Sequence, residues 1–228
     1  MTRNTNARLA GVAYLLYIAV SLPAVILFSN ATSGQGIAAK LAGIAQNALN
    51  LRLTLLLSMP SGFAALILAV TLYRITRDED RDIAMIAMMC RVAEAVTGVP
   101  FFLATLGLLS IATTTGLNAA DTAAAHTLAT FFLQVREWNP LISALFFATG
   151  SMLFCWLLAR GRIVPIPLAW FGVIASVLLV VLLPIQLIGF FEGPIFQLMW
   201  LPMGVFEIVL AIWFLSKGVR GRSEFAAA

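Results

Sequence analysis

Charged residues are scarce in this sequence. They make up 11% of its 228 residues, whereas soluble globular domains average about 25%. Hydrophobic residues account for 61% of the chain, and the mean hydropathy is +0.99. This balance excludes an ordinary soluble domain and predicts an integral membrane protein. Because few polar residues remain outside the hydrophobic segments, we predict a single domain over residues 1–222 and interpret residues 223–228 as a cloning remnant.

Cysteine and histidine are also nearly absent. The two cysteines, Cys90 and Cys155, lie in apolar segments toward the predicted cytoplasmic side, where thiols stay reduced, so we expect no structural disulfide. His126 is the single histidine, and one histidine cannot form a zinc site without further ligands at suitable spacing. We therefore predict no metal site and no cofactor.

The common catalytic and nucleotide-binding motifs are missing as well. The sequence contains no HExxH, GxSxG, Walker or GxGxxG pattern. Its formal net charge of +4 follows from basic residues beside hydrophobic segments, where they act as topology signals. Nucleic-acid binding would require a clustered basic surface instead. We therefore expect membrane lipids as surroundings, no nucleic-acid partner and, on balance, a non-enzymatic role.

Long hydrophobic runs dominate what the sequence does contain. A bilayer core about 30 Å thick needs about 20 helical residues. The first run is too long for the hydrophobic part of a typical signal peptide, so we interpret it as a span. The sequence predicts an all-α polytopic membrane bundle of six transmembrane helices, at residues 9–28, 51–73, 83–112, 141–159, 165–191 and 195–217.

The distribution of basic residues predicts the orientation of these spans. Cytoplasmic loops are enriched in Lys and Arg, so both termini are expected to be cytoplasmic. The inner side then holds ten basic residues and the outer side three. The inner group is Arg3, Arg8, Arg74, Arg77, Arg81, Arg160, Arg162, Lys217, Arg220 and Arg222, and the outer group is Lys40, Arg52 and Arg136.

Two outer connections also have helical character. Residues 33–47 carry apolar side chains at helical spacing and predict a short interfacial helix between spans 1 and 2. Residues 126–139 have a helical pattern that runs up to Pro140. This proline either begins a new helix, where its missing N–H costs nothing, or marks a kink in one long helix. Residues 113–125 are small and polar, which predicts a solvated loop.

Three charged residues lie deep inside the predicted spans, away from the span ends. Arg91 and Glu94 are the only charges in a run of apolar residues, and Glu207 lies in the last span. At 1.5 Å of rise per residue they are buried about 12, 17 and 15 Å from the cytoplasmic side. Charge at that depth costs about 2.5–3.5 kcal/mol per residue on insertion scales. Arg91 and Glu94 share a helix face, and we predict that Arg91 bridges Glu94 and Glu207.

Two interpretations of this group remain open. Arg91, Glu94 and Glu207 are either a structural tie between two helices or a binding or proton-exchange site within the membrane. A second set, Arg52, Arg136 and Glu137, lies near the predicted outer surface. Charges at helix ends often extend to the interface without further function, and the alternative is an outer vestibule leading to the charged group.

Several short motifs resemble one family. Arg91-Val92-Ala93-Glu94-Ala95 resembles the R-x-x-E-A signature of a bacterial six-helix membrane family, domain of unknown function 4386. Similar patterns follow in family order along nearly the whole chain, at residues 8–16, 72–74, 144–150, 166–172 and 207–218. The chain departs from the family pattern at Cys155-Trp156 and at Asn139-Pro140. The resemblance implies a six-helix bundle in a bacterial cytoplasmic membrane, with Arg91, Glu94 and Glu207 as its charged signature, and implies no activity.

These observations favour an integral membrane protein with an intramembrane charged pocket that binds or transports a small amphiphilic molecule. Arg91 would hold an anionic or carbonyl group, while Glu94 and Glu207 would balance its charge and carry protons. One alternative is a lipid-modifying enzyme that uses Glu94 or Glu207 as acid and base, with Ser58, Ser61 or Thr97 as the second reactive group. Another is a structural or regulatory membrane subunit. The sequence identifies no protein partner.

Overall fold

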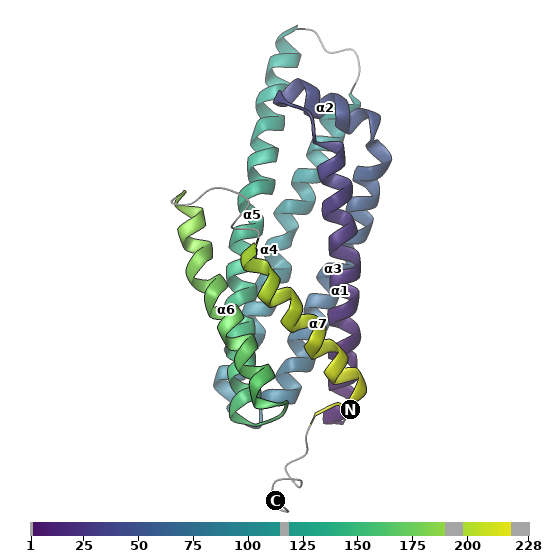
Figure 1. The fold of residues 1–228 in the computed structure, drawn as a ribbon. Coiled ribbons are helices and arrows are strands. Elements are labelled where there is room, and N and C mark those ends of the chain that lie inside the picture. The colour runs from purple at the N-terminus through teal and green to yellow at the C-terminus, as the bar shows by residue number, and fades with distance from the viewer. Residues whose placement is uncertain (1, 115–118, 190–197, 220–228) are drawn as a thin grey trace, which may run out of the picture. The chain divides into compact units, whose positions relative to one another are not determined.

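Helices joined by short turns make up the part of the chain described by the computed structural model, which covers residues 2–114, 119–189 and 198–219 (Figure 1). This range contains no strand, which confirms the predicted all-α class. Its seven helices are α1 (Arg3–Ala31), α2 (Gly36–Gln46), α3 (Ala48–Thr76), α4 (Arg81–Thr113), α5 (Ala119–Arg160), α6 (Ile166–Leu187) and α7 (Trp200–Ser216).

Five of these helices, α1, α3, α4, α5 and α6, are long and apolar enough to cross a membrane. A lipid environment offers no hydrogen bonds to exposed backbone groups, so long apolar segments form helices that satisfy their own N–H and C=O groups. The sixth predicted span corresponds to α7, which has 17 residues. Those residues rise about 25 Å, less than the bilayer core. Residues 195–197, at the start of that predicted span, lie outside the described residues.

Helix α5 resolves the alternatives at Pro140. The helix continues through this proline over its 42 residues, so Pro140 lies inside one long helix. The loop prediction for residues 113–125 was wrong for its second half, because α5 already begins at Ala119. The segment is rich in alanine, which has the highest intrinsic helix propensity. Small polar residues predict a loop, but the alanines in this segment favour the helix.

The chain divides into two compact units. Unit 1 comprises Met1–Leu16, Phe63–Ala95 and Ser143–Ala228, and unit 2 comprises Tyr17–Gly62 and Val96–Ile142. Helices α1, α3, α4 and α5 each contribute a portion to both units. Each of these four helices contains one proline, and all four prolines belong to unit 2: Pro23, Pro60, Pro100 and Pro140. A proline removes one backbone hydrogen bond from its helix.

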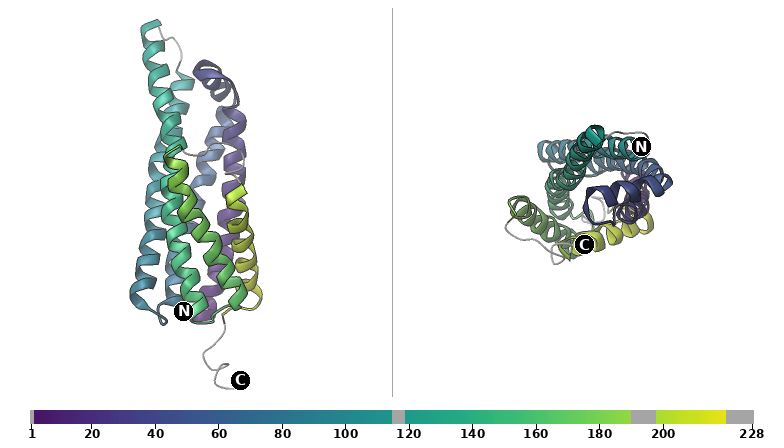
Figure 2. Two further views of the ribbon diagram at one scale, coloured as in Figure 1. Left: turned by 60° about the vertical axis from the view of Figure 1, so that its left-hand side comes forward. Right: turned by 90° about the horizontal axis from the view of Figure 1, so that it is seen from above.

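Close helix packing characterises unit 1. Helices α6 and α7 contact each other (Figure 2). A Cβ at Gly172 would overlap the ring of Phe206 and come within 2.6 Å of Cys155 Sγ. A Cβ at Gly11 would lie 2.9 Å from the carbonyl oxygen of Ala211. Small residues therefore allow the backbones to approach closely, as is common in membrane helix bundles.

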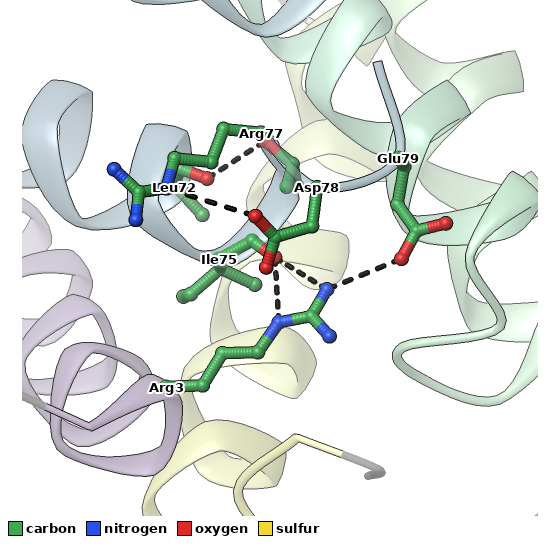
Figure 3. A network of polar contacts seen from close by, with 7 residues as sticks. Arg3, Leu72, Ile75, Arg77, Asp78 and Glu79 are labelled. Carbon is green, nitrogen blue, oxygen red and sulfur yellow. Dashed lines mark hydrogen bonds and ion pairs between the residues drawn. The ribbon is translucent and has the colours of Figure 1, made fainter. Parts of the chain in front are cut away.

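Polar contacts tie the start of α1 to the end of α3 within unit 1 (Figure 3). The Arg3 guanidinium donates hydrogen bonds from Nε and Nη2 to the carbonyl oxygen of Ile75, at 2.8 and 2.6 Å. Arg3 Nη2 also lies 3.3 Å from Glu79 Oε1. The carboxylate of Asp80 accepts a hydrogen bond from the backbone N–H of Ile83 at 3.2 Å. This contact caps the start of α4.

Unit 2 has its own apolar core, in which the short helix α2 takes part. The buried residues of this core are Ala31, Ile44, Leu51, Leu108 and Ala129. Figure 1 shows α2 crosswise to the adjoining ends of α1 and α3. A Cβ at Gly43 would lie 2.7 Å from the carbonyl oxygen of Ala31, so α2 packs closely against the end of α1. The predicted short helix is present, and its location in the membrane interface stays a prediction.

Candidate functional site

The charged group found in the sequence lies in unit 1. We call Arg91, Glu94 and Glu207 the charged cluster. Helix α4 supplies Arg91 and Glu94, which are three residues apart and therefore lie on one face of the helix. Arg91 Nη1 is 2.9 Å from Glu94 Oε2. The two residues are only 1% and 5% exposed, so this ion pair is shielded from solvent.

Helix α5 closes around Arg91 from another side. The Arg91 guanidinium carbon lies 4.8 Å from the centre of the Phe147 ring, which is within cation–π distance. A Cβ at Gly150 would lie 3.0 Å from Ala87 O and 3.2 Å from Arg91 Cγ, so α5 has room only for glycine here without a shift of its neighbours. Ser143 Oγ donates a hydrogen bond to the carbonyl oxygen of Glu94 at 3.1 Å. Phe147 and Gly150 belong to the family-like motif at residues 144–150, whereas no sequence signal points to Ser143.

Glu207 on α7 completes the charged cluster in a different way. It is 6% exposed and interacts electrostatically with Arg91 and Glu94. Among the described residues it forms no direct ion pair, and its buried Oε1 atom has no hydrogen-bond partner there. Tyr14 on α1 and Cys155 on α5 are also buried in unit 1. The structure therefore brings Glu207 into range of Arg91 without the direct contact that a bridging arrangement would need.

The charge balance of the cluster is uneven. It contains one guanidinium and two carboxyl groups, so its fully ionised state carries one excess negative charge. An uncompensated charge in a low-dielectric interior costs several kcal/mol, about 3–5 when one partner of a buried pair is removed. A neutral cluster therefore contains either one proton or one bound cation. Glu207 is the member with an uncommitted oxygen atom.

A groove runs along α4 on the face opposite Arg91. Its volume is about 590 Å³, and its lining is apolar except for Asp82 and Cys90: Asp82, Met85, Ile86, Met89, Cys90, Ala93 and Phe146. At 100° per residue, the α4 residues of this lining centre on the helix side that faces away from Arg91. The groove is thus separate from the charged cluster.

The second predicted set lies in unit 2, and its members have different environments. Arg136 on α5 is 8% exposed, whereas Arg52 and Glu137 are exposed. The guanidinium carbon of Arg136 lies 3.3 Å from the centre of the Phe28 ring and 3.8 Å from that of Phe101. Arg136 Nη1 donates a hydrogen bond to Thr105 Oγ1. No ion pair joins Arg52, Arg136 and Glu137 within the described part of the chain.

The other candidate reactive groups are already engaged or lie in unit 2. Ser58 Oγ donates to the carbonyl oxygen of Thr54 at 2.7 Å, and Ser61 Oγ lies 3.1 Å from Ser21 Oγ. Ser58, Ser61 and Thr97 belong to unit 2, whereas the charged cluster belongs to unit 1. In the described ranges no three His, Cys, Asp or Glu side chains come together as a metal site.

Apolar spanning helices with a buried charged cluster define a multi-pass integral membrane protein of helical type. A family model described as "Domain of unknown function (DUF4386)" matches residues 9–218. The chain belongs to this family, as its resemblance in the sequence indicated. No curated protein and no solved structure matches it.

Proposed function

We propose that this protein binds or carries a small amphiphilic molecule and exchanges a proton at the charged cluster. The observation that carries the proposal is the surplus carboxyl group beside a single, already paired arginine. Arg91 is occupied by Glu94 and covered by Phe147, so Glu207 is the member that can change its partner. A proton or the cationic head of a ligand would neutralise it in turn.

The membrane arrangement that goes with this function is a six-span bundle. In it α7, together with the residues before it, forms the sixth span, α2 lies in the outer interface, and both termini are cytoplasmic. The positive-inside distribution of basic residues supports this orientation. The membrane would be the bacterial cytoplasmic membrane, as the family resemblance implies. In this orientation Glu207 lies near the middle of the bilayer, where ionisable residues mark ion and substrate pathways.

Proton release on ligand binding tests the proposal. Purified protein in lipid nanodiscs is titrated with dodecylamine, a cationic amphiphile, in weakly buffered solution that contains a pH dye. We expect saturable release of about one proton per bound ligand, corrected for the ligand's own titration. The reason is that the ammonium head of dodecylamine replaces the proton as the charge that neutralises the cluster. The Glu207→Gln variant should bind more weakly and release no proton, whereas Glu137→Gln, which alters an exposed carboxylate, should behave as wild type.

A structural role is the second candidate, and the close packing of Arg91 against Gly150 and Phe147 favours it. It predicts that no amphiphile binds saturably and that Glu207→Gln changes only stability. If folded wild-type protein releases no proton when dodecylamine is added, the proposed function is contradicted. The structural tie between helices then remains as the interpretation of the charged cluster. A lipid-modifying enzyme has less support, because the hydroxyl groups of Ser58 and Ser61 already form hydrogen bonds with Thr54 O and Ser21 Oγ.

A further inference from the structure

Arg136 in unit 2 is a buried cation that has no carboxylate partner among the described residues. It is 8% exposed, and no carboxylate of the described residues forms an ion pair with it. Buried charges in proteins are normally paired with an opposite charge or bound to one. Arg91 in unit 1 follows this rule through Glu94. The described residues instead offer Arg136 two aromatic rings and one hydroxyl group.

The rings and the hydroxyl group hold the guanidinium in a fixed plane. Phe28 and Phe101 lie against it at cation–π distance, and such stacking leaves the edges of the guanidinium as its remaining binding positions. The hydroxyl group of Thr105 donates to the carbonyl oxygen of Phe101 at 2.8 Å. Its oxygen is therefore oriented to accept from Arg136 Nη1. One edge donor of Arg136 is thus fixed by α4.

The other edge of Arg136 is uncommitted. The Nε atom is buried and has no hydrogen-bond partner among the described residues. Nη2 shares this edge and forms no hydrogen bond in the same range. Nε and Nη2 present two parallel N–H donors, and this fork matches the two oxygens of a carboxylate or phosphate. Two preoriented N–H donors on a positively charged group are the features that bind an oxyanion.

We propose that Arg136, held by Phe28, Phe101 and Thr105, binds the oxyanion head of an amphiphile. The sequence predicts that this part of α5 lies near the outer membrane surface, where lipid phosphates and carboxylate heads are concentrated. The apolar surroundings of Arg136 in unit 2 suit the chain of such a molecule. The bound oxyanion supplies the negative charge that the described residues do not. This site is separate from the charged cluster and does not rest on its proposed function.

Headgroup comparison in the intact protein tests this proposal. Full-length protein in phosphatidylcholine nanodiscs is titrated with dodecyl phosphate and, in parallel, with dodecyltrimethylammonium, which has the same chain and the opposite charge. The variants are Arg136→Gln and, as a matched control, Arg52→Gln, which removes an exposed arginine of the same unit. Circular dichroism and thermal unfolding establish that each variant is folded.

We expect wild-type protein to bind dodecyl phosphate at least about tenfold more tightly than the cationic amphiphile, which is the effect of one charge-assisted contact. Arg136→Gln should remove this difference, and Arg52→Gln should leave it within about threefold of wild type. Absence of saturable dodecyl phosphate binding by wild type would overturn the proposal, even if Arg136→Gln does not fold. An equal loss of dodecyl phosphate affinity in Arg136→Gln and Arg52→Gln would also overturn the proposal, because it would show that the anion responds only to the general surface charge.

Inorganic phosphate distinguishes the source of the anion. Phosphate without a chain should displace dodecyl phosphate only at a concentration more than about a hundredfold higher, because it lacks the buried methylene groups. Displacement at equal concentration would contradict the amphiphile and identify a free-anion site instead. Loss of dodecyl phosphate binding in Glu207→Gln, with Arg136 intact, would place the ligand at the charged cluster and overturn the assignment to Arg136.

Discussion

Among the described residues, units 1 and 2 each bury one arginine, and they compensate its charge in different ways. In unit 1, Arg91 forms an ion pair with Glu94 and has a second carboxyl group, Glu207, within electrostatic range. In unit 2, Arg136 is covered by two phenylalanine rings and bonded to one hydroxyl group. When all groups are ionised, the first arrangement carries one excess negative charge and the second one excess positive charge among the described residues. Burial alone therefore does not define a site, because the sign of the excess charge decides which ligand can bind.

The largest expected effect follows from replacing Arg91. Arg91→Leu removes the cation and leaves two buried carboxyl groups without compensation, which should lower the free energy of unfolding by about 3–5 kcal/mol. Thermal unfolding in detergent measures this change. The double variant Arg91→Leu/Glu94→Leu should recover part of the loss, since it replaces the ion pair by apolar contacts. Unchanged stability of the single variant would show that Arg91 does not compensate these carboxyl groups.

A tight contact at Gly172 should give the next largest effect. Gly172→Ala forces a methyl group against Phe206 and Cys155, and such overpacking costs about 1–3 kcal/mol. Gly204→Ala is the matched control in the same unit, because a Cβ there meets no atom within 4 Å. Alanine favours the helix, so this control should raise stability by about 0.5–1 kcal/mol. Equal effects of both substitutions would contradict close packing of α6 in unit 1.

Replacing Arg136 should cost less than replacing Arg91. Arg136→Leu loses cation–π contacts and one hydrogen bond, about 2 kcal/mol at a desolvated site, and it leaves no carboxylate without a partner. Removal of an uncompensated buried charge offsets part of that loss. The measurement is the difference in unfolding midpoint between Arg136→Leu and Arg91→Leu in the same detergent. If Arg136→Leu lowers the free energy of unfolding as much as Arg91→Leu does, the proposed difference between the two units is contradicted.

The smallest effect is expected at the partly exposed pair of Arg3 and Glu79. Their side chains are 24% and 11% exposed, and pairs of this kind contribute about 0–1 kcal/mol. Glu79→Gln leaves the two hydrogen bonds from Arg3 to Ile75 in place, so the loss should stay below about 1 kcal/mol and shrink at high salt. A loss above about 2 kcal/mol would show that the pair is coupled to a larger network.

The two arginines also differ in how far the sequence could predict them. Arg91 and Glu94 stand out because they interrupt a long apolar run, and their spacing alone places them on one helix face. The partners of Arg136 could not be found in this way. Phe28 and Phe101 belong to α1 and α4, in runs where phenylalanine is common, and no local pattern distinguishes these two rings from the others.

Helix α5 shows the same limit at the level of secondary structure. The sequence has apolar residues at helical spacing on both sides of Pro140. This pattern leaves open whether the proline begins a helix or lies within one. Proline at a helix start and proline inside a membrane helix have the same local signature. The continuity of α5 over Ala119–Arg160 is a property of the folded chain.

Composition and local period predict the class of this protein, its family, the costly charges within its spans and the approximate positions of five long apolar helices. The physical reason is that lipid requires apolar side chains and an internally bonded backbone. The division into two units, the long-range position of Glu207 and the aromatic enclosure of Arg136 are properties of the folded chain alone. Each depends on contacts between residues far apart in the chain, and such contacts have no period that a sequence can display.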